Sequence, residues 1–221
     1  MNSSGTKQPI YLGNQPYQEE QKEIKGTEIT IDGQTYYKIS NADKMRPFFM
    51  SLVSHSDHWM FISSTGGLSA GRINSDHALF PYYTDDKITE SYEYTGSKTL
   101  ILVDKEERRL LWEPFSSRYS GVYGIERNLY KNVFGNKLIF EEINHDLGLT
   151  FSYQWATSER FGFVRQATLT SNAPCDLKLS ILDGIQNILP YGVPEGLQAS
   201  SSNLVDAYKK CELETGNLGL Y

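Results

Sequence analysis

The sequence has few of the residues that build disulfide frameworks, metal centres or membrane spans. It contains only two cysteines among 221 residues, Cys175 and Cys211, and their spacing matches neither a disulfide framework nor a metal site. No run approaches the roughly 20 apolar residues of a membrane span. The N-terminus has neither an apolar core nor an early basic cluster, so no secretory signal is predicted. These absences favour a cytoplasmic protein without a membrane partner.

Positive charge is also scarce. The chain has 21 lysines and arginines against 27 aspartates and glutamates, a formal net charge of −6. Proteins that bind nucleic acid usually present a basic patch or stripe. A nucleic-acid partner is therefore not expected.

What the sequence does contain is typical of strands. Aromatic residues make up 13% of the chain, including 15 tyrosines, and charged residues make up 22%, against about 25% in average domains. Aromatic residues, glycine, serine and threonine combined with little alanine favour strands over helices. The chain is long enough for one large domain with a substantial core.

The spacing of apolar residues predicts antiparallel sheets. Asp32 and Gly33 lie between two β-prone runs and give the strongest hairpin signal in the chain. Five apolar residues from Leu147 to Trp155 alternate with small polar ones, which places the five on one sheet face. Strand-like runs recur about every 8–12 residues, as in a sandwich or barrel. Besides the hairpin over 27–40, strands are predicted over 48–53, 59–62, 99–104, 109–112, 123–133, 137–143, 161–170 and 176–185.

The two ends of the chain differ from this pattern. Residues 1–26 form a polar leader, and residues 27–221 form the sandwich domain. One helix is expected, over 203–214, with Ser202 or Asn203 as its N-cap. Its apolar stripe consists of Leu204, Val205, Tyr208 and Cys211. The chain stops at LGLY, which resembles the start of another strand, so we expect the sandwich to be cut short.

Residues 58–83, HWMFISSTGGLSAGRINSDHALFPYY, are the stretch most typical of a site. They predict a strand, a tight Ser-Ser-Thr-Gly-Gly turn, a second strand and an ordered aromatic loop. A guanidinium or carboxylate can bridge two adjacent sugar hydroxyls, and an aromatic ring offers a flat face for a pyranose. The predicted sugar-binding residues are Trp59, Arg72, Asp76, His77 and Tyr82. In the alternative interpretation, Arg72 pairs with Asp76 or Asp85 to fix the loop, and the aromatic residues belong to the core.

No complete catalytic set, metal site or cofactor motif is predicted. Neighbouring residues on a strand point to opposite faces, which argues against a metal site made by the His and Asp side chains of 55–58. The same alternation argues against the acidic pairs 85–86 and 141–142 flanking a glycosidic bond at about 5–9.5 Å. The Gly-Gly turn at 66–67 is too short for a phosphate-binding loop.

A series of segments resembles the N-terminal domain of cellobiose-phosphorylase-like enzymes, glycoside phosphorylases of the glycosyltransferase 36 type. The segments are SSTGGLSAGR (63–72), LLWEPFS (110–116), YGIERNLY (123–130), FSYQWA (151–156) and FGFVRQATLTSNAPCDLKLSIL (161–182). The resemblance covers about residues 40–190 and rests on the order and pattern of the segments more than on identity.

The resemblance implies a large antiparallel β-supersandwich, as in galactose mutarotase. In such enzymes it precedes a helical linker and an (α/α)6 barrel that carries the catalytic acid and the phosphate site. Because this sequence contains no barrel, no catalytic residue is assigned to it.

These observations lead to three hypotheses for function. In the first, the chain is the non-catalytic sandwich of a glycoside phosphorylase or hydrolase that acts on β-glucosides. The sandwich is inactive by itself, and its loops border the sugar pocket of the enzyme. In the second, it is a free-standing carbohydrate-binding sandwich. In the third, it is a structural domain that supports the barrel or forms a homodimer, since unpaired strand edges drive association.

Overall fold

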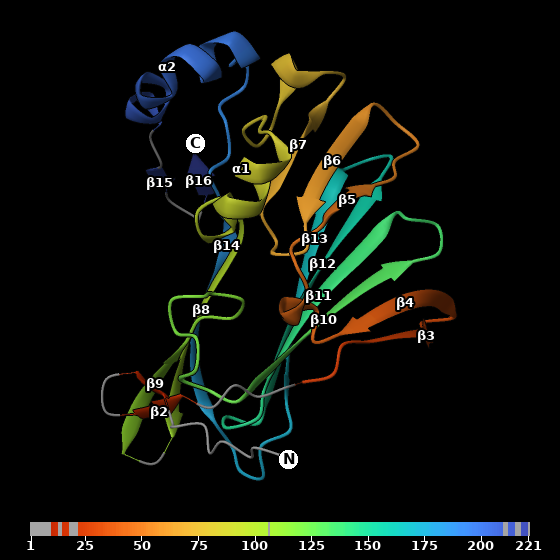
Figure 1. Ribbon diagram of the computed structural model, residues 1–221. Coiled ribbons are helices and arrows are strands. Elements are labelled where there is room, and N and C mark those ends of the chain that lie inside the picture. Colours follow the sequence, from red (N-terminus) through yellow and green to blue (C-terminus); the bar gives the residue numbers. More distant parts are fainter. Residues whose placement is uncertain are drawn as a thin grey trace, which may run out of the picture.

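The described part of the chain consists mainly of antiparallel strands in three sheets (Figure 1). The structure is a computed structural model, and it describes residues 10–12, 15–17, 22–105, 107–209, 212–214 and 218–220. Two short hairpins lie near the chain ends: β1 (Ile10–Leu12) with β2 (Gln15–Tyr17), and β15 (Glu212–Glu214) with β16 (Leu218–Leu220). The predicted all-β sandwich of antiparallel sheets with a short helix near the C-terminus is confirmed.

The largest sheet has six strands in the order β13-β12-β11-β10-β4-β3. Its strands are β3 (Lys25–Ile31), β4 (Gln34–Ser40), β10 (Ile125–Asn132), β11 (Lys137–Asn144), β12 (Leu149–Ser158) and β13 (Gly162–Ser171). The five alternating apolar residues from Leu147 to Trp155 are all buried, as predicted. Asp32 and Gly33 both have positive φ, 48° and 73°, so the β3–β4 hairpin has the turn geometry that Asp-Gly favours.

Two three-stranded sheets form the second layer. They are β14-β8-β9, from β8 (Gly96–Lys105), β9 (Arg108–Trp112) and β14 (Lys178–Gln186), and β5-β6-β7, from β5 (Phe49–Leu52), β6 (His58–Ser63) and β7 (Leu68–Arg72). In Figure 1 the first lies to the left of the six-stranded sheet and the second lies at the top. One apolar core joins all three sheets through residues such as Ile62, Val103 and Phe140. The layers therefore enclose a single core.

The Gly-Gly turn between β6 and β7 is required by close packing. A Cβ at Gly67 would overlap the backbone oxygen of Ile88. Gly66 has φ 96°, and a Cβ there would lie 2.8 Å from the hydroxyl of Tyr153. Both positions therefore need glycine, which explains why the turn can fit between helix α1 (Asp85–Glu90) and the core.

The helical elements depart from the prediction. Helix α2 (Glu195–Tyr208) has a kink at Ser201, where the backbone is not helical (φ −143°, ψ 38°). The predicted start at 203 lies close to the segment after the kink, whereas the segment from Glu195 to the kink was not predicted, and residues 212–214 form strand β15 rather than the end of the helix. Val205 of the predicted stripe is buried but Leu204 is exposed, while the side chains of Tyr208 and Cys211 lie outside the described residues. The sequence also gave no signal for α1. Three short 3-10 helices complete the described part: η1 (Ala42–Lys44), η2 (Ser75–His77) and η3 (Ser91–Glu93).

Tertiary contacts explain the first segment of α2, which the sequence did not predict. The backbone amide of Glu195 donates to Asp76, 2.9 Å away, and Ser75 donates to the Glu195 carboxylate. Gln198 accepts a hydrogen bond from the amide of Tyr82. These contacts stabilise a first turn that contains Gly196 and has low intrinsic helix propensity. Among the described residues, no helix combines the length and apolar character needed to cross a membrane.

Candidate functional site

Trp59 and Tyr82, two of the predicted sugar-binding residues, lie together on the outer face of the β5-β6-β7 sheet. Their ring centroids are 5.6 Å apart at an interplanar angle of 87°. The contacts continue from Trp59 to Phe61, 5.7 Å away, and from Phe61 to Phe49, 5.5 Å away. We call these four residues the aromatic row. Phe49 and Tyr82 at its ends are 46% and 43% exposed.

The alternation of strand β6 builds the aromatic row. Met60 and Ile62 point into the core, so Trp59 and Phe61 point outward. Gly71 lies opposite Trp59 on β7, and a Cβ there would lie 2.5 Å from Cζ2 of the indole. The glycine therefore leaves room for the indole beside the neighbouring strand.

Arg72 is not brought together with the aromatic row. Its partner in the β6–β7 ladder is His58, so Arg72 and His58 share the face opposite to Trp59 and Gly71. The Arg72 guanidinium forms an exposed ion pair with Asp57, with Nη2 3.3 Å from Oδ1. Asp57 is thus its partner, in place of the predicted Asp76 or Asp85.

Asp76 and His77 are held by their neighbours in the loop after β7. Asp76 accepts the Glu195 amide at the start of α2, and its own amide donates to Asn74. The Nδ1 atom of His77 lies 2.8 Å from Oδ1 of Asn74. Both residues therefore connect the loop to itself or to α2.

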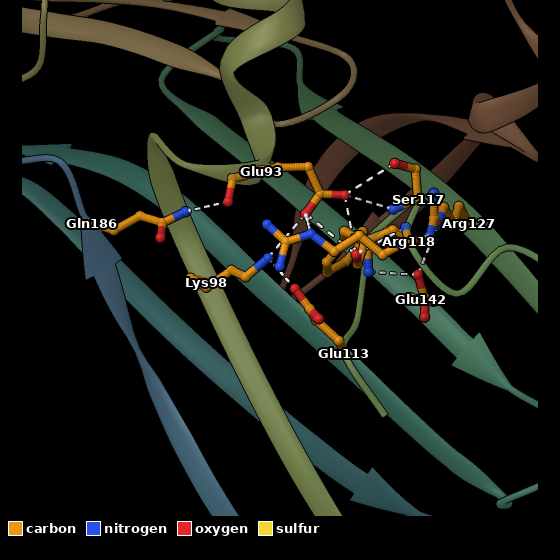
Figure 2. A network of polar contacts seen from close by, with 10 residues as sticks. Glu93, Lys98, Glu113, Ser117, Arg118, Arg127, Glu142 and Gln186 are labelled. Atoms are coloured by element: carbon orange, nitrogen blue, oxygen red, sulfur yellow. Dashed lines mark hydrogen bonds and ion pairs between the residues drawn. The ribbon is translucent and has the colours of Figure 1, made fainter. Parts of the chain in front are cut away.

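A buried network of charged residues, which sequence reasoning missed, lies between the two layers (Figure 2). Its centre on the six-stranded sheet is Glu142, which is 1% exposed. The Glu142 carboxylate accepts three hydrogen bonds, each 2.7 Å long, from the indole of Trp112, the amide of Phe115 and Nε of Arg127. Arg127 also donates from Nη2 to the backbone oxygen of Ser116 at 2.8 Å. A buried charge of this kind is stable only when it is paired and hydrogen-bonded, as here.

The second half of the network surrounds Lys98 on β8. Figure 2 shows its ammonium group between the carboxylates of Glu93 and Glu113, with both of which it forms ion pairs. Glu93 also accepts hydrogen bonds from the amide and hydroxyl of Ser117. Burial acts to raise the pKa of Glu93, but the hydrogen bonds from Ser117 and Lys98 outweigh it, so the pKa lies below its usual value.

Phe115 connects the two halves and has a strained backbone. Its φ is 64°, a left-handed conformation that is rare for a bulky residue. In this conformation its amide donates to Glu142, and its ring makes edge contacts with Phe140, Phe151 and Tyr153. Such a conformation costs of order 1–3 kcal/mol, and strain of this kind clusters at functional sites.

A pocket of about 180 Å³ opens beside this network. We call it the central pocket; it lies between η1, the β6–β7 turn, η3 and β10, and Asp43, Thr65, Tyr92, Phe115 and Arg127 are among its lining residues. A cavity of about 10 Å³ shares Thr65, Tyr92 and Phe115 and continues to Lys98. The pocket therefore combines aromatic surface with hydroxyl, carboxylate and guanidinium groups.

Of the two acidic pairs considered from the sequence, 141–142 lies on strand β11, whereas 85–86 begins helix α1, so the predicted strand alternation does not apply to it. Glu141 and Glu142 face opposite sides of the sheet, as predicted, because Glu141 accepts from the hydroxyl of Tyr130 on the outer face. Glu142, Glu93 and Glu113 are each paired with a cation. This arrangement is suited to stabilising the fold and to orienting donors.

One sequence signal indicates the network. On β11 the buried positions are Leu138, Phe140, Glu142 and Asn144, so a glutamate occupies a core position in an alternating strand. A carboxylate at such a position must find buried partners. The signal predicts a buried polar site but does not identify its partners.

Comparison with known family models and with curated proteins finds no match for this chain.

Proposed function

We propose that this chain is the non-catalytic β-sandwich of a carbohydrate-active enzyme, a glycoside phosphorylase or hydrolase that acts on β-glucosides in the cytoplasm. In this proposal the sandwich contributes a sugar-binding surface, and the reaction takes place on an (α/α)6 barrel domain of the parent enzyme. The observation that carries the proposal is the aromatic row. The resemblance of the sequence to cellobiose-phosphorylase-like enzymes supplies the substrate class.

The aromatic row has properties suited to a sugar chain. Its four rings follow one another at centroid distances of 5.5–5.7 Å across a single sheet face. Aromatic rings provide large apolar area with a defined orientation, and tyrosine also carries a hydroxyl group. Successive rings on a rigid sheet can contact successive sugar units of an extended oligosaccharide.

Calorimetric titration of the chain with cellotetraose tests this proposal. Trp59→Ala is expected to weaken binding at least tenfold, about 1.4 kcal/mol, because the indole lies in the middle of the row. The matched control is Tyr191→Ala, since Tyr191 is 99% exposed and is not part of the aromatic row. Equal affinities of the wild type and Trp59→Ala would rule out the aromatic row as the binding surface.

A structural role is the second candidate, and strand β14 favours it. β14 is the edge strand of its sheet, and it exposes Ile181, Leu182 and Ile185. An exposed apolar edge is prone to pair with another strand or domain, such as the barrel or a second copy. Dimerisation in sedimentation velocity that Leu182→Lys abolishes, with no binding of cellotetraose, would favour this role.

A further inference from the structure

We propose that the central pocket is a separate binding site for one small neutral polyol, of the size of a single sugar ring, with Arg127 as its main hydrogen-bond donor. The inference rests on the proposed function for the class of ligand, and on the central pocket itself for the place of binding.

The guanidinium of Arg127 is oriented but incompletely used. Glu142 holds Nε and the oxygen of Ser116 holds Nη2. Within the described ranges, Nη1 donates no hydrogen bond to the protein, and the side chain lines the central pocket. A planar guanidinium has five N–H donors in a fixed geometry, so those left over can reach two adjacent hydroxyl groups of a ligand.

The charge of the surroundings selects a neutral ligand over an anion. Arg127, Lys98 and Arg118 are matched by Glu142, Glu93 and Glu113 in the network. Asp43 at the exposed rim of the pocket is likewise paired, with Lys44. A phosphate or carboxylate would therefore enter a site without excess positive charge, whereas neutral hydroxyl groups meet both donors and acceptors.

The walls and size of the pocket indicate a single ring. Phe115 and Phe140 supply apolar surface, and Tyr92 supplies a ring whose hydroxyl makes no hydrogen bond within the described residues. The volume of about 180 Å³ is smaller than the roughly 300–1,000 Å³ of sites that hold drug-sized ligands. An oligosaccharide therefore does not fit, but one unit does. The strained backbone of Phe115 is consistent with a functional role of this wall.

Saturation-transfer NMR and chemical-shift titration of the full chain with D-glucose, glycerol and inorganic phosphate test the inference. We expect the two polyols to bind and phosphate not to bind. Arg127→Lys keeps a cation beside Glu142 but removes the second edge of the guanidinium, and it is expected to weaken glucose binding at least tenfold. Tyr92→Phe removes one hydroxyl from the wall and is expected to weaken binding several-fold.

Tyr94→Phe is the matched control, because Tyr94 directly follows η3, is exposed and does not line the central pocket. It should leave glucose affinity unchanged. Should Arg127→Lys fail to fold, Tyr92→Phe against Tyr94→Phe still decides the question. Absence of glucose binding, stronger binding of phosphate, or equal affinities of Tyr92→Phe and Tyr94→Phe would overturn the inference.

A further variant separates this inference from the proposed function. Trp59→Ala is expected to lower cellotetraose affinity and leave glucose binding in the central pocket intact. If cellotetraose binds through the aromatic row but glucose does not bind in the pocket, the inference fails alone. If glucose binds and cellotetraose does not, the aromatic row fails as the oligosaccharide surface while the pocket stands.

Discussion

Replacing Glu142 by glutamine is expected to destabilise the sandwich strongly. The wild-type carboxylate accepts three hydrogen bonds of 2.7 Å, from the indole of Trp112, the amide of Phe115 and Nε of Arg127. The amide of glutamine has one acceptor oxygen, so at least one of these donors faces an NH2 group. Arg127 also loses its only carboxylate partner in the described part of the chain.

The magnitude follows from the burial of the pair. Breaking a buried ion pair by removing one partner costs about 3–5 kcal/mol, because an uncompensated charge stays in the interior. In chains of 150–250 residues each kcal/mol shifts the melting temperature by about 2–4 °C, so we expect Glu142→Gln to lower it by roughly 6–20 °C. A double variant, Glu142→Leu with Arg127→Met, should recover most of this loss, since apolar residues of similar volume remove both charges.

The assay is thermal and urea unfolding followed by circular dichroism, with Asp104→Asn as the matched control. Asp104 pairs with Arg109 through the same Nε geometry, at 2.6 Å, but on the surface. Exposed ion pairs contribute little to stability, so Asp104→Asn should have a much smaller effect. If the two variants unfold at the same temperature, the buried Glu142 network contributes no more to stability than an exposed ion pair, and the reasoning is refuted.

Three further predictions concern other parts of the fold. Gly67→Ala should lower the free energy of unfolding by about 3 kcal/mol in urea unfolding, because a Cβ there overlaps the backbone of α1, whereas Gly184→Ala, with open space around it, should leave the unfolding midpoint nearly unchanged. The lowered pKa of Glu93 stabilises the fold above the unfolded pKa of about 4.3, and this contribution disappears as pH falls through the folded pKa. The difference in unfolding free energy between the wild type and Glu93→Gln should therefore narrow from pH 7 toward acid, and a constant difference would contradict the assignment. Asp76→Ala should speed amide hydrogen exchange in the first turn of α2, since the Glu195 amide loses its acceptor, and unchanged exchange there would argue against this anchoring role.

Local patterns in the sequence were enough to predict the strands. The Asp32-Gly33 turn, the alternation ending at Trp155 and the Gly-Gly turn at 66–67 each depend on a few neighbouring residues. Side-chain alternation and glycine conformations act over such short distances. The sequence therefore predicted the all-β class and most strand positions. It also predicted that Trp59 and Tyr82 lie in the same region of the fold.

Helix α2 illustrates what local patterns miss. Its apolar spacing predicted a start at 203, close to the segment after the kink at Ser201, but contacts with Asp76 and Tyr82, more than 100 residues away, stabilise an additional segment that begins at Glu195. Intrinsic propensity is a weak signal that tertiary contacts override. The partner of Arg72 was missed for a related reason, because the β6–β7 register decides that Arg72 shares a face with His58 rather than Trp59.

The sequence by itself determined the strand pattern, the turn chemistry and the aromatic character of the stretch over residues 58–83. Only the tertiary structure decided that Glu142 meets Trp112 and Arg127, that Lys98 lies between two glutamates, and that a pocket opens beside them. The physical reason is the range of the interactions. Alternation is fixed by each strand alone, but a buried charge network depends on the register and packing of several strands at once.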